Sequence, residues 1–204
     1  MRLHVFAALL LMSLASPAAL AASLDQSKPV SPADAALAPD VRLRLRIPLR
    51  DGVYEGDVIG GEMTGHGVYS WTNDDRYEGE FRHGVPEGQG VLTKPDGFRY
   101  QGGFAAGRYQ GQGSAKFPDG SQYNGAFANG EFNGQGSLAM ANGDHYDGDF
   151  RDNQPNGMGT YVTSAGQRYD GAMANGRFEG AGTMTMPNGE VRRGLWHDNQ
   201  LVQP

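Results

Sequence analysis

Tyrosines recur every 23 residues along most of this chain, and each begins a short run in which apolar and polar residues alternate. In one such run, Tyr123, Gly125 and Phe127 fall on one side and Asn124 falls on the other. Alternation with a period of two predicts a β-strand with one buried face. A fixed period of about 20 to 50 residues is typical of repeat proteins, in which each unit must stack on its neighbours to bury a core. The recurring tyrosines are Tyr54, Tyr77, Tyr100, Tyr123, Tyr146 and Tyr169, and the glycines two residues after them are Gly56, Gly79, Gly102, Gly125, Gly148 and Gly171.

Two turn signals divide each unit into two strands. The unit 123–145 contains Asn129-Gly130 and Asn142-Gly143, and Asn-Gly pairs favour the positive φ angles of tight hairpin turns. The 32 glycines of the chain also disfavour helices. We therefore predict an all-β fold, an elongated single-layer meander of stacked β-hairpins with six repeats over residues 54–191 and a partial seventh repeat or C-terminal cap over residues 192–204. The repeats are 54–76, 77–99, 100–122, 123–145, 146–168 and 169–191.

The two faces of the predicted sheet differ in polarity. We expect the tyrosines and the fifth residue of each unit to form the core, because a chain must bury apolar area to fold. The glycines leave an open floor on which an aromatic ring of the neighbouring strand can lie. The fifth-position residues are Val58, Phe81, Phe104, Phe127, Phe150, Met173 and Trp196. The opposite face carries Glu55, Glu78, Gln101, Asn124, Asp147 and Asp170.

The repeated motif resembles the MORN (membrane occupation and recognition nexus) repeat, whose pattern is Tyr-x-Gly-x-aromatic, then Asn-Gly, Gly-x-Gly and a Pro-Asp-Gly-like turn. Tyr123-Asn-Gly-Ala-Phe-Ala-Asn-Gly130 and Phe117-Pro-Asp-Gly120 match it closely, and the resemblance covers about residues 54–199. It implies a non-catalytic scaffold that associates with itself, a protein or a membrane. Asn153 and Asp74 depart from the motif by replacing turn glycines.

The N-terminal residues predict export. Residues 1–21 resemble a secretory signal peptide, with an apolar run and a small-residue cleavage site that ends at Ala21 or Ala22. Residues 22–40 are rich in Ala and Pro and predict a flexible linker. The chain has no cysteine, which removes disulfides, a thiolate metal site and a cysteine nucleophile. We expect a periplasmic or secreted protein of a bacterial type.

Residues 41–53 predict a capping strand in which arginines alternate with apolar residues. Pro48 cannot donate to a sheet ladder, so we expect this strand at an edge. Its arginines can meet phosphate groups or an acidic partner, but pairing with nearby carboxylates such as Glu55 and Asp57 is favoured. The candidate residues are Arg42, Arg44 and Arg46.

Charge argues against nucleic acid as a partner. The formal net charge is −6, and residues 51–204 carry 20 acidic and 11 basic side chains. Nucleic-acid affinity depends mainly on neutralising phosphates, which an acidic body does not do. The same charge weakens a general attraction to anionic membranes.

Aromatic residues that vary between repeats are the candidates for an individual binding surface. The fixed 23-residue interval indicates that the tyrosine and fifth-position columns form the core. A position that differs between repeats can instead provide a surface specific to one repeat. These candidates are Tyr69, Trp71, Tyr109, Phe132, Tyr161 and Phe178.

The sequence predicts no catalytic, cofactor or metal site. The Gly111-Gln-Gly113 segment lacks the following helix that a nucleotide loop requires. His66 and the other histidines occupy different columns of the repeat, and acidic pairs such as Glu78 with Glu80 are typical of a solvated face. We expect a non-catalytic binding or scaffolding module of the cell envelope that recognises a protein or itself. Binding of envelope lipid or glycan through an aromatic groove is the alternative, and an enzyme is disfavoured.

Overall fold

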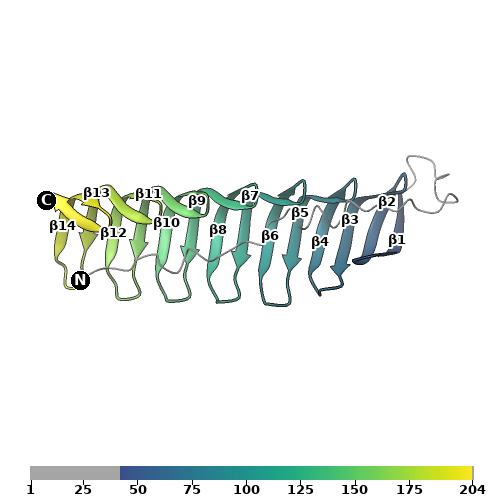
Figure 1. Ribbon diagram of the computed structural model, residues 1–204, viewed down its shortest axis with the longest axis horizontal. Helices are drawn as coiled ribbons and strands as arrows, with labels where there is room; N and C mark the ends of the chain where they lie inside the picture. Colours follow the sequence, from purple (N-terminus) through teal and green to yellow (C-terminus); the bar gives the residue numbers. More distant parts are fainter. Residues whose placement is uncertain (1–41, 204) are drawn as a thin grey trace. The chain divides into compact units, whose positions relative to one another are not determined.

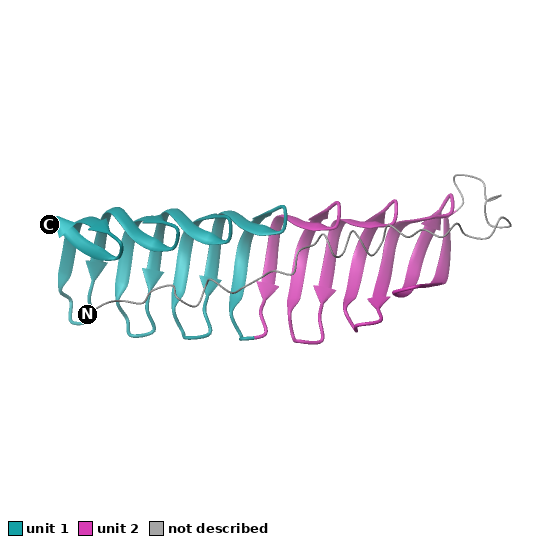
Figure 2. Ribbon diagram, in the orientation of Figure 1, with its two compact units in different colours: residues 1–13, 119–204 teal, residues 14–118 magenta. Residues whose placement is uncertain are grey.

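The computed structural model describes residues 42–203, which form fifteen β-strands in chain order (Figure 1). These described residues include no helix, and therefore none long and apolar enough to cross a membrane. They fall into two compact units, residues 42–118 and residues 119–203 (Figure 2). The predicted signal peptide, linker and residues Val41 and Pro204 lie outside the described residues.

The unit of residues 42–118 is a meander in which each strand pairs antiparallel with the next. β1 is the first strand and has β2 as its only neighbour in the sheet order, as expected for an edge strand that contains Pro48. The strands are β1 (Arg42–Leu49), β2 (Gly52–Ile59), β3 (Glu62–Trp71), β4 (Arg76–Arg82), β5 (Val85–Thr93), β6 (Arg99–Ala105) and β7 (Arg108–Lys116).

The unit of residues 119–203 repeats this arrangement, again with consecutive antiparallel pairing. The predicted all-β hairpin meander is thereby confirmed within each unit. The strands are β8 (Gln122–Ala128), β9 (Glu131–Ala139), β10 (His145–Arg151), β11 (Gln154–Val162), β12 (Arg168–Ala174), β13 (Arg177–Thr185), β14 (Val191–His197) and β15 (Gln200–Gln203).

Every repeat contains a bulge just after the glycine that follows its tyrosine. In the second repeat, Gly79 pairs with Gly90 but Phe81 pairs with Pro86, so three residues of β5 lie opposite one residue of β4. Gly88, in the middle of the three, has a φ of 72°, which favours glycine. On β4, the Phe81 and Tyr77 rings meet in a T-shaped arrangement, with their centroids 5.0 Å apart.

The core of each hairpin is a tyrosine ring that lies over two paired glycines. The Tyr123 hydroxyl donates to the carbonyl of Ala126 at 2.9 Å, and a Cβ added to Gly136 would lie 2.6 Å from Cε2 of Tyr123. Gly136 pairs with Gly125, so one ring covers a glycine of its own strand and a glycine of the next. The expectation that the ring comes from the neighbouring strand is therefore right for Gly136 and wrong for Gly125.

The buried tyrosine hydroxyls are poor acids and remain hydrogen-bond donors. Burial raises the pKa of Tyr54 and of Tyr169 to about 12, and nearby carboxylates add to the shift. Their hydroxyls donate to the carbonyls of Asp57 and Ala172, three residues along the chain. The same bond recurs in all six repeats, so the tyrosine column both fills the core and ties down the bulge.

The two departures from the repeat motif keep the backbone conformation of the residues that they replace. Asn153 and Asp74 both have a φ of 66°, in the left-handed region. Asn and Asp tolerate this region better than other non-glycine residues. The turns therefore survive without glycine.

Candidate binding surface

Five of the six varied aromatic residues lie in the core and not on the surface. Their side chains are at most 4 % exposed, so the prediction that they form an accessible patch is wrong for Tyr69, Tyr109, Phe132, Tyr161 and Phe178. Trp71 alone is half-buried, with its ring 4.4 Å from that of Tyr69.

Ring stacking explains why these varied positions are buried. The Phe132 ring stacks on that of Tyr123 at a centroid distance of 3.7 Å and an interplanar angle of 8°. Phe178 stacks on Tyr169 in the same way, at 3.8 Å. The tyrosine is thus covered by glycines on one side and by an aromatic ring on the other, which leaves no exposed aromatic groove at these positions.

Of the three varied tyrosines that are buried, Tyr109 stacks on Tyr100 at a centroid distance of 4.0 Å, and the other two bind carboxylates at the turns. The Tyr69 hydroxyl donates to Asp51 Oδ1 at 2.6 Å, and the Tyr161 hydroxyl donates to Asp144 Oδ2. Burial acts to raise the pKa of Asp144, but hydrogen bonds from Tyr161, Ser164 and Asn142 outweigh it and hold this pKa below its usual value. Asp144 is therefore a structural acceptor that ties two neighbouring turns together.

The acidic residues of the polar face are engaged in local bonds. Asp57, Glu80 and Asp149 each accept the backbone N–H of a residue in the bulge of the next strand, at 2.9–3.1 Å. Their neighbours two residues earlier bind basic side chains, as Glu78 binds Arg76 at 2.7 Å and Asp147 binds His145 at 2.6 Å. Within residues 42–203, no three His, Cys, Asp or Glu residues are grouped so that they could hold a metal ion.

The arginines of β1 divide into two groups. Arg46 pairs with Glu55 at 2.6 Å, as the sequence favoured. Arg44 lies opposite Asp57 in the register, yet neither Arg42 nor Arg44 forms an ion pair with a residue that the structure describes. Two cationic side chains therefore remain available on this strand.

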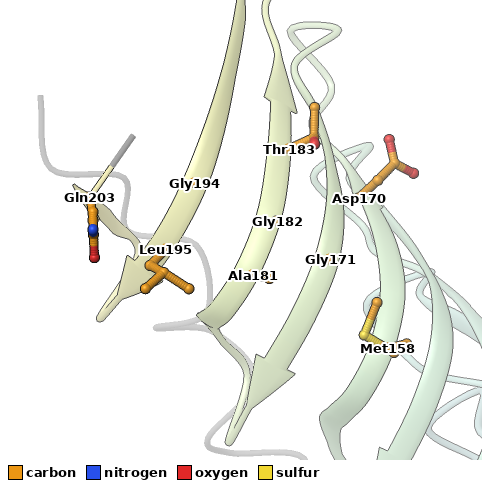
Figure 3. Close-up of a pocket in the computed structure, with 9 residues that line it drawn as sticks. All are labelled: Met158, Asp170, Gly171, Ala181, Gly182, Thr183, Gly194, Leu195 and Gln203. Carbon is orange, nitrogen blue, oxygen red and sulfur yellow. The ribbon is translucent and has the colours of Figure 1, made fainter.

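The outer face of β11 to β15 contains a shallow hollow of about 560 Å³ (Figure 3). Its floor includes Gly171, Gly182 and Gly194, which lie side by side in the register. Figure 3 shows Asp170 and Thr183 toward one end of the strands and Met158 and Leu195 toward the other. The hollow thus has one polar wall and one mainly apolar wall, in which Gln203 lies opposite Leu195.

The apolar wall of this hollow is unusually exposed. Met158 is 60 % exposed and Leu195 is 47 % exposed, although most large apolar side chains of the described residues are buried. Ala181 lies directly opposite Leu195 and extends the apolar row. Exposed apolar side chains that gather in one hollow are typical of a binding site.

Sequence reasoning missed this hollow although the sequence carried a signal for it. The residue between the two glycines of each Gly-x-Gly pair points outward, and four of the six repeats place a polar residue there. The last two repeats place Met158 and Ala181 there instead. A break in an otherwise polar column marked the position, but only the register shows that Leu195 lies beside it.

Comparison with known proteins identifies the repeat. The family model described as "MORN repeat" matches residues 54–76, 77–99, 100–122, 123–145, 146–168 and 169–191. No curated protein matches the chain.

Two solved structures resemble the chain at low sequence identity. One is the TCP domain of Drosophila melanogaster SAS-4 (dCPAP) in complex with a proline-rich motif of Ana2 (dSTIL), with 14 % identity, a TM-score of 0.42, and coverage of 78 % of this chain and 97 % of that one. The other is the TCP10 domain of Danio rerio CPAP in complex with a STIL peptide, with 14 % identity, a TM-score of 0.26, and coverage of 75 % of this chain and 84 % of that one.

Proposed function

Because the chain belongs to the MORN-repeat family, whose repeats are in general non-catalytic binding modules, we propose that it is a binding or scaffolding module of the cell envelope that recognises a protein partner. The observation that carries this proposal is the hollow over β11 to β15, with its exposed Met158 and Leu195. Covering apolar surface of this kind is the main favourable contribution to protein association.

The chemistry of the hollow fits a protein better than a glycan or a lipid. None of the residues that line it is aromatic, so it offers no ring on which a sugar can stack. The unit of residues 119–203 carries ten acidic and five basic residues, a balance that repels anionic head groups. A polar wall beside an apolar wall suits a protein segment that presents both kinds of side chain.

The envelope location rests on the N-terminal sequence. Residues 1–21 have the pattern of a signal peptide, and the chain has no cysteine. The mass of the protein isolated from its own cells tests this part, since removal of the signal leaves a chain that begins at Ala22 or Ser23. An intact N-terminus in the isolated protein would contradict it.

Quantitative affinity capture from the cells that make the protein tests the partner. Met158→Glu and Leu195→Glu place a charge in the hollow. Because a partner would bury this charge without an ion-pair partner, each variant is expected to reduce recovery of the specific partner at least tenfold. The matched control is Gln112→Glu, which adds the same charge at an equivalent exposed position of another repeat. Equal recovery by all variants, or no protein retained above background, would refute the proposed function.

Light scattering separates a foreign partner from a second copy. If the wild-type chain is a dimer and the Leu195→Glu variant is a monomer, the hollow binds another copy of this chain. If both are monomers while capture still depends on Leu195, the partner is a different protein.

A further inference from the structure

The outer edge of β1 presents backbone groups that no described residue covers. β1 stands first in the strand order and pairs only with β2, in an uninterrupted register from Arg42 opposite Ile59 to Leu49 opposite Gly52. An edge strand of this length is a template for another strand.

The register decides which residues of β1 direct their backbone outward. Leu49 and Gly52 flank the two-residue turn Arg50–Asp51, and such a flanking pair exchanges its hydrogen bonds across the hairpin. Because bonded and non-bonded pairs alternate in an antiparallel ladder, the odd-numbered residues of β1 bond to β2 and the even-numbered residues face away from it. Pro48, which has no N–H, falls in the outward set, where the ladder with β2 does not need its N–H.

The residues of β1 whose backbone groups face away from β2 include its three arginines. Arg42, Arg44 and Arg46 share the polar face of β1, while Leu43, Leu45 and Ile47 share the opposite face. Arg46 is neutralised by Glu55, but Arg42 and Arg44 have no ion pair among the described residues. On the other face, Leu45 is 36 % exposed. The edge therefore offers free backbone groups at the arginines, whose side chains alternate along the strand with apolar side chains.

We propose that β1 accepts an added antiparallel strand from a protein partner in which acidic residues alternate with apolar ones. In this pairing each acidic residue lies opposite an arginine, where directly opposed side chains are about 4.5–5.5 Å apart and unlike charges attract. The apolar residues of the added strand then lie beside Leu43 and Leu45. Backbone hydrogen bonds supply affinity, and the alternation of side chains supplies specificity.

A strand fits this edge better than an anionic membrane does. Of the two unpaired arginines, Arg44 lies opposite Asp57 of β2 and Arg42 lies opposite Ile59, and the carboxylate of Asp57 would repel an extended anionic surface. A single strand contacts only the edge and avoids this carboxylate. This site is separate from the hollow over β11 to β15, so it would stand even if the hollow had no partner.

A fluorescent peptide in which glutamate and valine alternate three times is the direct probe, and anisotropy of its complex with the full chain is the readout. We expect binding that is at least tenfold tighter than that of a peptide with the same composition in two blocks, or of the alternating lysine–valine peptide. Equal binding of all three peptides, or no binding of the alternating acidic peptide, overturns the proposal.

Methylation of the peptide backbone tests strand addition without changing the protein. The glutamates lie opposite the outward-facing residues of β1, so N-methylation of the glutamates removes the hydrogen bonds to the edge and should abolish binding. N-methylation of the valines, whose N–H groups face away from β1, should leave affinity within about threefold. Equal loss from the two peptides overturns the predicted register.

Protein variants place the site. Arg42→Glu with Arg44→Glu should weaken peptide binding at least tenfold, whereas Arg82→Glu with Arg108→Glu, exposed arginines on β4 and β7, should not. Circular dichroism and the melting temperature establish that both double variants are folded. If phosphatidylglycerol vesicles bind the chain through Arg42 and Arg44 while the acidic peptide does not, the edge recognises a membrane and the proposal is wrong. Loss of capture by Met158→Glu with peptide binding intact separates this site from the hollow.

Discussion

Each hairpin has an inner face, which carries the tyrosine column, and an outer face, which carries the polar column. The two faces differ in how far their contacts vary between repeats. On the inner side, Tyr77 and Tyr123 make the same contacts with paired glycines and with a carbonyl three residues on. On the outer side, the equivalent residues Glu80 and Ala126 differ, and only the carboxylate accepts the N–H group in the bulge of the next strand. The contacts of the tyrosine with its glycines and its carbonyl acceptor recur in every repeat and set the fold, whereas outer contacts can be lost in a repeat that gains another role. The exposed apolar residues of the hollow lie on the outer side, as this difference leads one to expect.

Removal of an inner tyrosine should have the largest effect. Tyr123→Ala deletes a fully buried ring together with its stacking on Phe132, and we expect a loss of about 3–5 kcal/mol in the free energy of unfolding, measured by urea denaturation. Tyr123→Phe keeps the ring and removes only the hydrogen bond to Ala126, so it should cost about 1 kcal/mol. Similar losses in the two variants would mean that packing over the glycines is not the main contribution.

A methyl group under the ring should be the next most harmful change. In Gly136→Ala the new Cβ lies 2.6 Å from Cε2 of Tyr123, and overpacking of this kind costs about 1–3 kcal/mol. Gly120→Ala is the control, because its Cβ meets nothing within 4 Å. Its loss in the free energy of unfolding comes only from the backbone φ of +94° and should be about 1 kcal/mol. If Gly120→Ala lowered the melting temperature more than Gly136→Ala, backbone conformation and not ring contact would explain the glycine column.

Changes on the outer side should be smaller. Asp149→Ala leaves the N–H of Met158 without its carboxylate acceptor and should cost about 1 kcal/mol, whereas Asp147→Ala removes only an exposed pair with His145 and should cost less. The reverse change, Ala126→Asp, supplies the missing acceptor in another repeat and should stabilise that hairpin slightly. An unfolding midpoint that falls in Ala126→Asp would contradict this account of the bulge.

The smallest predicted effect is a pH dependence of the pairing between β13 and β14. The Glu179 carboxylate bonds to His197 at 2.8 Å and raises the pKa of this histidine above its usual value. The contribution of the pair is therefore complete below the unfolded pKa of about 6.5 and is lost as the pH rises through the higher folded value. Urea midpoints measured between about pH 6 and about pH 8 should fall slightly more for the wild type than for His197→Gln. Parallel curves for the two proteins would show that the exposed pair has no effect.

Sequence patterns were sufficient for the parts of the fold that depend on neighbouring residues. The 23-residue spacing, the Asn-Gly turns and the alternation around Tyr123 predicted the hairpins, because turn conformation and strand alternation are local properties of the backbone. The same reasoning favoured pairing of the β1 arginines with nearby carboxylates, which is right for Arg46 and Glu55 and wrong for Arg42 and Arg44 among the described residues.

Burial and accessibility were decided only by the tertiary structure. Alternation alone did not show that Phe132 stacks on Tyr123, because the bulge places three residues opposite one and changes which side chains meet. The hollow brings together Met158, Ala181 and Leu195, which belong to three different strands. The unpaired state of Arg42 and Arg44 depends on the side chains across the ladder. Such contacts join residues of different strands. The type of a residue does not determine which side chains become its neighbours when the strands pair.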